Sequence, residues 1–125
     1  MTTLNLATVE IKAFVPARDF ALSKRFYQAL GFTLASEFDG VAYFHSGACS
    51  FLLQNFYVAE FADNLMMQLL VENVDDWYAH VQSQGIAEAF GVRVDAPVNQ
   101  AWAMRDFVLF DPSGVLWRIA QNLPK

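Results

Sequence analysis

The chain carries one structural pattern twice, 54 residues apart: an apolar run, a helical stretch and a closing glycine. In the first copy Asp19 suits the start of the helix and Gly31 its end. Asn73 and Gly85 take these positions in the second copy, and in both copies twelve residues separate the two. A strand-helix-strand unit repeated at a fixed offset predicts one packing arrangement used twice, with a site at the seam between the copies.

The composition favours a single folded domain. Of the 125 residues, 55% are hydrophobic and 17% charged, which suits a chain with a real core. We expect one domain over residues 1–125, made of a first module at about residues 9–58 and a second at about residues 65–122. The formal net charge of −5 argues against a nucleic-acid backbone or an anionic membrane surface as the main partner.

The cellular location is constrained by cysteine usage and by hydrophobic stretches. Cys49 is the only cysteine in the sequence, so no internal disulfide forms and a reducing compartment is the simpler expectation. Residues 1–9 lack the basic start and apolar run of a signal peptide. No apolar stretch reaches the roughly 20 residues that span a bilayer. We expect a soluble, cytoplasmic protein.

The first module is expected to begin with a strand at residues 9–15. A helix capped by Asp19 and ended by Gly31 comes next. Three short strands then follow, at about residues 33–37, 41–45 and 50–57, and residues 59–64 are the expected linker between the modules.

The second module is expected to open with residues 65–71, a run apolar enough for a central strand. Asn73 caps the second helix and Gly85 stops it. A strand at residues 86–94, a loop at 95–101 and a hairpin of residues 104–110 and 115–122 complete the module, with Asp111-Pro112-Ser113-Gly114 as the hairpin turn. The predicted order is therefore βαβββ, twice.

Three stretches in this order carry a resemblance to a known family. They are Val-Pro-Ala-Arg-Asp at residues 15–19 with Leu-Gly-Phe at 30–32, Leu-Val-Glu-Asn-Val-Asp-Asp at 70–76, and Arg-Asp-Phe-Val-Leu-Phe-Asp-Pro-Ser-Gly at 105–114. In these stretches the chain resembles the vicinal oxygen chelate superfamily: glyoxalases, extradiol dioxygenases, and the fosfomycin- and bleomycin-resistance proteins. The resemblance implies an α+β fold of two βαβββ modules forming a half-open barrel around the site, and a homodimer.

The resemblance also implies a place for a divalent metal, which metal-dependent relatives hold with two histidines and a glutamate. Here these three places fall on Lys12, Met66 and Arg118. Two cationic side chains and a thioether do not hold a hard divalent ion, which takes oxygen or imidazole ligands. His45 and His80 have no second ligand at a recognisable spacing. We therefore expect no metal and no cofactor.

A pocket of mixed character is expected around the same places, because side chains two apart in a strand share a face. The closing hairpin, placed by analogy with the family, adds further residues, with Trp102 at the mouth. Eight residues are expected to bind the ligand: Lys12, Phe14, Met66, Gln68, Trp102, Met104, Asp106 and Arg118. Apolar and aromatic surface with a few polar groups is typical of a small-molecule site.

The charge of the ligand stays open at this stage. Lys12 and Arg118 stand where the positive charge of the metal lies in relatives, so they suit an anionic group. In the alternative interpretation, these two side chains pair with Glu10 and Asp106 or extend to water. The acidic protein as a whole suits a cationic ligand.

The leading hypothesis is a metal-free, bleomycin-resistance-type protein that sequesters a small organic molecule in a cleft between the modules, with no catalytic residue. The first alternative is a metal-dependent lyase, isomerase or dioxygenase of the same superfamily. A second is metal-free acid–base catalysis by Asp106, or by Glu10 beside Lys12. A third is a regulatory or partner-binding module without a ligand.

Overall fold

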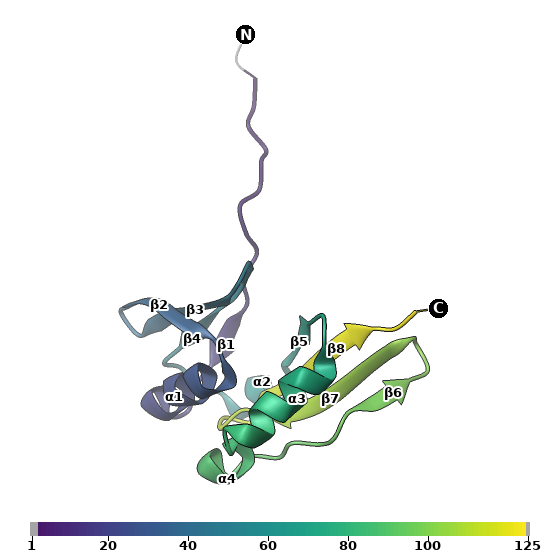
Figure 1. The fold of residues 1–125 in the computed structure, drawn as a ribbon. Helices are drawn as coiled ribbons and strands as arrows, with labels where there is room; N and C mark the ends of the chain where they lie inside the picture. Colours follow the sequence, from purple (N-terminus) through teal and green to yellow (C-terminus); the bar gives the residue numbers. More distant parts are fainter. Residues whose placement is uncertain (1–2, 125) are drawn as a thin grey trace.

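The computed structural model describes residues 3–124, and its strands form two four-stranded sheets with helices against one face of each (Figure 1). The first sheet has the order β1-β4-β3-β2 and the second the order β5-β8-β7-β6. In each sheet the first strand pairs in parallel with the last, and the other pairs are antiparallel. The strands are β1 (Phe14–Pro16), β2 (Thr33–Phe38), β3 (Val41–Ser46), β4 (Cys49–Gln54), β5 (Met66–Leu70), β6 (Val98–Gln100), β7 (Met104–Phe110) and β8 (Leu116–Asn122). The predicted α+β class with two related modules is confirmed.

The two main helices begin and end where the sequence predicts. They are α1 (Phe20–Leu30) and α3 (Val74–Ser83). Asp19 and Asn73 cap them, because each side chain accepts a hydrogen bond from the backbone N–H three residues later, at 3.1 and 3.0 Å. Gly31 and Gly85 follow with φ of 122° and 62°, in the region that favours glycine.

Two predictions for the second module are wrong. Residues 86–94 are not a strand: Ile86–Phe90 form the short helix α4, and Val94 makes only an isolated bridge to Leu109. The third-to-last strand is instead β6, inside the predicted loop at residues 95–101. A short apolar run has no periodicity that separates a helical turn from a strand, and here Gly85 and Gly91, both left-handed, bracket a helix.

The junction between the modules also differs from the prediction. Residues 59–64, the predicted linker, form helix α2 (Ala59–Asn64), and its Ala62 is fully buried. The following strand, β5, lies at the edge of the second sheet rather than in its centre. Its apolar run serves two faces: Leu69 is buried, whereas Met66 and Leu70 are about half exposed.

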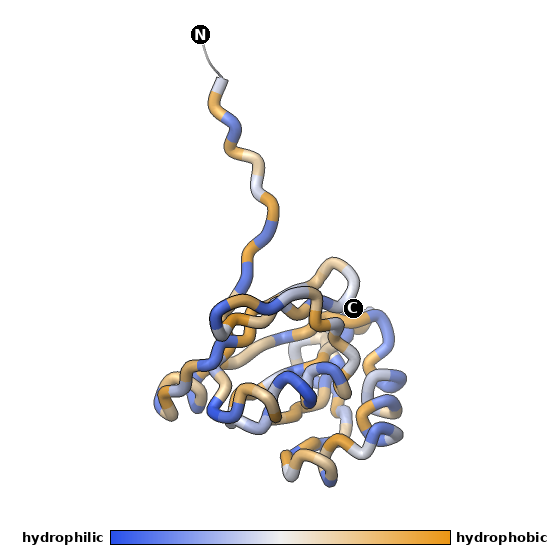
Figure 2. The backbone as a smooth tube through the Cα atoms, turned by 90° about the vertical axis from the view of Figure 1, so that its left-hand side faces the viewer, coloured by the Kyte–Doolittle hydropathy of each residue, from blue (hydrophilic) through white to orange (hydrophobic). Residues whose placement is uncertain are grey.

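The predicted strand at residues 9–15 is much shorter in the structure, since β1 covers only Phe14–Pro16. The preceding residues, 4–12, run away from the rest of the molecule as an N-terminal arm (Figures 1 and 2). A strand needs a partner for its backbone groups, and β4 faces the chain only from Phe14 onward. Four apolar side chains of the arm are 79–99% exposed: Leu4, Leu6, Val9 and Ile11.

One core joins the two modules. The helix-covered faces of the two sheets meet at three aromatic rings, Tyr27 from α1, Phe51 from β4 and Trp117 from β8. Their ring centroids lie 4.8 Å (Tyr27–Phe51), 5.6 Å (Tyr27–Trp117) and 5.3 Å (Phe51–Trp117) apart. Aromatic pairs in tilted or edge-on geometry at such distances add to the stabilisation from burial.

A buried hydrogen-bond chain crosses the same junction. The Tyr27 hydroxyl donates to Asp111 Oδ2 at 2.6 Å and accepts from Trp117 Nε1 at 2.9 Å. The other carboxylate oxygen, Oδ1, accepts from the backbone N–H groups of Ser113 and Val115, both at 2.9 Å. Burial raises the pKa of the Asp111 carboxyl, and the bonds from Tyr27 and the turn oppose that rise. The helix of the first module is thus tied to the last turn of the second.

Replacing Tyr27 with phenylalanine tests this junction. Tyr27→Phe leaves Asp111 short of a donor and the Trp117 indole N–H without its acceptor, so we expect a loss of about 1–3 kcal/mol of unfolding free energy. Tyr78→Phe is the matched control, because the Tyr78 hydroxyl bonds only to the exposed Gln82 side chain, and its cost should stay within about 0.5 kcal/mol. Denaturant titration measures both.

The same variant has an expected pH dependence. The raised pKa means that the contribution of Asp111 to stability is fully present below the ordinary aspartate pKa and is lost as pH rises through the folded value. Tyr27→Phe removes a donor that lowers this pKa, so its penalty should grow from about pH 4 to about pH 7. An equal penalty at both values would contradict the role given to the carboxylate.

Candidate functional site

The face of the second sheet that turns away from the helices carries five of the six predicted site residues of that module, and the sixth, Trp102, lies outside its strands. Side chains of directly paired residues share a face. The register pairs Met66 with Leu116, Gln68 and Val108 with Arg118, and Asp106 with Ala120. This surface, the open face of the second sheet, therefore carries Met66, Gln68, Met104, Asp106, Val108, Leu116 and Arg118. The strand register places these residues on one face. That they contact a ligand is a prediction.

A hollow of about 390 Å³ lies on this open face. Its apolar wall comes from β6, β7 and β8, with Val98, Val108, Phe110 and Leu116 as its main members. Two of the eight predicted residues, Asp106 and Arg118, also line it. The hollow thus combines an apolar surface with polar groups, namely the Asp106–Arg118 and Arg93–Asp95 ion pairs and Gln100, the usual character of a small-molecule site.

The Asp106–Arg118 pair is held in place by its own hydrogen bond and by a further one from Gln100. Arg118 Nη1 donates to Asp106 Oδ2 at 3.1 Å, and Gln100 Nε2 donates to Asp106 Oδ1 at 2.9 Å. Asp106 is only 2% exposed, so both of its oxygens are used inside the protein, whereas the Arg118 side chain is 29% exposed. Arg118 has used one of its five N–H donors on this carboxylate. The pair presents hydrogen-bond donors to the hollow without a net charge.

Of the predicted residues of the first module, Phe14 lies in β1 of the other sheet and Lys12 lies in the arm just before it. Lys12 Nζ is 2.7 Å from Glu10 Oε1 and 5.1 Å from the centroid of the Tyr43 ring, and Phe14 is half exposed. Glu10 also accepts from the Tyr43 and Ser50 hydroxyls. The bond from Lys12, above all, lowers the pKa of Glu10, and the same bond raises the pKa of Lys12. Lys12 and Arg118 each pair with a carboxylate, as the alternative interpretation expects.

Trp102 lies in the turn between β6 and β7 and is 58% exposed. It does not line the hollow, and neither do Lys12 and Phe14.

Sequence reasoning missed Gln100, because it placed a loop where β6 forms. Alternation within residues 98–100, opposite the strand at 104–106, is the signal that would have found it.

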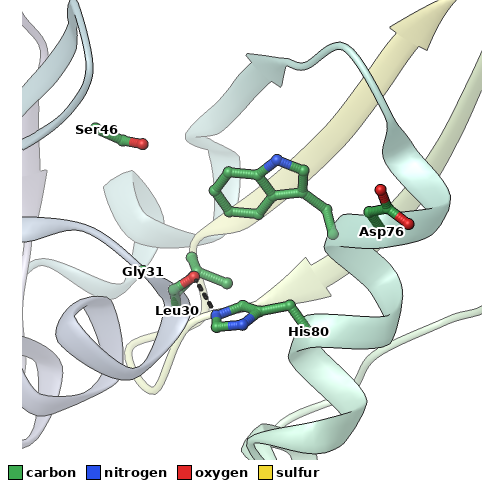
Figure 3. A pocket seen from close by; sticks show the side chains of 6 residues that line it. Leu30, Gly31, Ser46, Asp76 and His80 are labelled. Carbon is green, nitrogen blue, oxygen red and sulfur yellow. Dashed lines mark hydrogen bonds between the residues drawn. The ribbon is translucent and has the colours of Figure 1, made fainter.

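A second hollow lies at the seam between the modules, as the repeated pattern predicts, but none of the eight predicted residues lines it. We call it the seam groove; it measures about 300 Å³ and is lined by Leu30, Gly31, Ser46, Asp76, Trp77 and His80 (Figure 3). His80 Nε2 lies 3.1 Å from the Leu30 carbonyl oxygen, which joins α3 to the end of α1. His80 therefore has a structural contact.

The places of the family's metal ligands do not fit a divalent ion. Lys12, Met66 and Arg118 offer an ammonium, a thioether and a guanidinium, and both cations are engaged with carboxylates. Within residues 3–124, no three His, Cys, Asp or Glu side chains gather in a way that would hold a metal. No step of a mechanism is therefore drawn through a metal at these places.

Comparison with known proteins identifies the family of this chain. The chain belongs to the Glyoxalase/Bleomycin resistance protein/Dioxygenase superfamily, whose sequence model matches residues 7–119. It is 30% identical over 114 residues to a bleomycin resistance protein of Klebsiella pneumoniae, covering 86% of this chain and 88% of that protein. No helix among residues 3–124 has the length and apolar character needed to cross a membrane.

Two solved structures show the same fold at similar identity. One is a bleomycin resistance determinant encoded on the transposon Tn5, with 26% identity, a TM-score of 0.80, and coverage of 92% of this chain and 98% of that one. The other is a bleomycin-binding protein in complex with bleomycin, with 27% identity, a TM-score of 0.79, and coverage of 92% and 99%.

Arg118 should matter for stability through its partner. Arg118→Met leaves the buried Asp106 carboxylate with Gln100 alone, so we expect a loss of about 2–4 kcal/mol of unfolding free energy. The double variant Arg118→Met/Asp106→Leu should regain most of this loss, because it buries no charge. Denaturant titration compares them, and a double variant no more stable than the single one would contradict this view of the pair.

Proposed function

We propose that this protein binds an antibiotic of the bleomycin type and sequesters it without chemical change. The observation that carries the proposal is the hollow on the open face of the second sheet, with its apolar wall and its neutral Asp106–Arg118 pair. Burial of apolar surface supplies the affinity, at about 25 cal/mol per Å² before the costs of ordering. The remaining N–H donors of Arg118 orient the ligand through its acceptor atoms.

Sequestration fits the residue types better than catalysis. The metal places carry Lys12, Met66 and Arg118, which are not ligands for a divalent ion. Asp106 already accepts hydrogen bonds at both oxygens and is 2% exposed, so it is poorly placed to take a proton from a ligand. The bleomycin-binding relative supports a ligand of this class, since its structure contains bleomycin.

The binding unit in this proposal is a homodimer. The N-terminal arm exposes four apolar side chains, and Phe14, Met66 and Leu70 are half exposed on the open faces of the two sheets. Apolar surface of this extent marks a protein interface. Two copies that set the first sheet of one against the second sheet of the other would bring Lys12 and Phe14 to the same cleft as the residues of the second module, completing the predicted set of eight.

Calorimetric titration with bleomycin tests the binding site. Val108→Glu places a carboxylate in the apolar wall of the hollow, so we expect bleomycin to bind at least about 10-fold more weakly than to the unchanged protein. Ser83→Glu adds the same charge at an exposed position of α3 and should leave the affinity within about two-fold. Equal affinity of Val108→Glu and the unchanged protein would remove the site from this hollow.

The role of the arm is tested by its apolar residues. Val9→Asp/Ile11→Asp puts two charges where the proposal has the arm packed against a second copy, so the mass measured by light scattering should fall from two chains to one. Thr8→Asp, at an exposed polar position just before them in the same arm, should leave the mass of two chains. A monomeric unchanged protein would contradict the proposed dimer.

A further inference from the structure

The seam groove has a composition unlike that of the hollow on the second sheet. The end of α1 supplies Leu30 and Gly31, the end of β3 supplies Ser46, and α3 supplies the remaining three residues. In Figure 3, Ser46 and Asp76 lie on opposite sides of the groove, which Trp77 also lines. The groove is therefore built by both modules around one aromatic side chain.

The seam groove has one acidic side chain, Asp76, among its lining residues. The Asp76 carboxylate forms no ion pair with any of the residues that the structure describes, and no cationic side chain lines the groove. His80 Nε2 is already engaged with the Leu30 carbonyl, so the Asp76 carboxylate is the charged group left for a ligand, and the Ser46 hydroxyl lies on the other side of the groove. A carboxylate favours a ligand that carries N–H donors and a positive charge.

The apolar part of the groove favours the same ligand class. The half-buried Trp77 offers its indole, the aromatic ring that attracts cations most strongly. The floor is open because Gly31 has no side chain: a Cβ there would lie 3.6 Å from His80 Nε2 and 4.0 Å from the Trp77 ring. Gly31 also has a φ of 122°, which other residues rarely adopt.

We propose that the seam groove is a second binding site, which takes a small organic cation: an ammonium group on a compact apolar or flat body. The ammonium pairs with Asp76, and the body stacks on Trp77. A volume of about 300 Å³ is at the lower end of small-molecule pockets, so the ligand is a small one. This site shares no lining residue with the hollow on the second sheet, so the proposal does not depend on that hollow.

An NMR titration of the full chain with benzylamine tests the proposal, with benzyl alcohol as the neutral analogue of the same shape. Benzylammonium should shift the Trp77 indole N–H and the Gly31 amide, and benzyl alcohol should bind at least about five-fold more weakly. Asp76→Asn removes the charge without a change of shape and should weaken benzylammonium about three- to ten-fold. Glu88→Gln, an exposed carboxylate on α4 that does not line the groove, should change the affinity less than two-fold.

The outcomes separate cleanly. Shifts at Trp77 and Gly31 that need the ammonium and depend on Asp76 support the site. Equal binding of the amine and the alcohol, equal binding to Asp76→Asn, or shifts confined to other parts of the chain would overturn it. Because Asp76 makes no side-chain bond with the rest of residues 3–124, Asp76→Asn should fold normally, and the unchanged amide spectrum serves as the check.

Discussion

The hydroxyl of Tyr27 lies between a carboxylate and an indole that belong to the other half of the molecule. It donates to Asp111 and accepts from Trp117, in a region without access to water. A buried carboxylate is costly unless its lone pairs are used, and the first helix supplies the donor that the last hairpin lacks. The two modules therefore fold as one body, with a common core formed by the helix-covered faces of both sheets.

This arrangement decides where a ligand can bind. The helix-covered faces of the two sheets form the core, so their opposite faces are free. The hollow with the Asp106–Arg118 pair lies on the open face of the second sheet. The metal places that the family resemblance implies carry Lys12, Met66 and Arg118, and the two cationic side chains among them are paired with Glu10 and Asp106.

Local signals made much of the fold predictable. Asp19 and Asn73 bond to the backbone of their own helices, and the Asp111–Gly114 turn bonds to itself, so their roles are visible in the sequence. Strand alternation likewise placed Asp106 and Arg118 on one face. The failures depend on distant partners: β5 is an edge because of the sheet order, β6 exists only because β7 pairs with it, and no strand among the described residues pairs with residues 4–12. The repeated pattern predicted a site at the seam, but the residues that line the seam groove were missed because they come from three elements far apart in sequence.

In the proposed function, the ligand binds on the open face of the second sheet and not on its helix-covered face. Methyl NMR spectra recorded during a titration with bleomycin test it most directly, because Val108 and Leu116 lie on the open face while Leu109 and Ile119 lie in the core of the same two strands. If the ligand binds on the open face, we expect large, saturable shifts for Val108 and Leu116 and small ones for Leu109 and Ile119. Shifts of the reverse order, or none at any of the four, would contradict it.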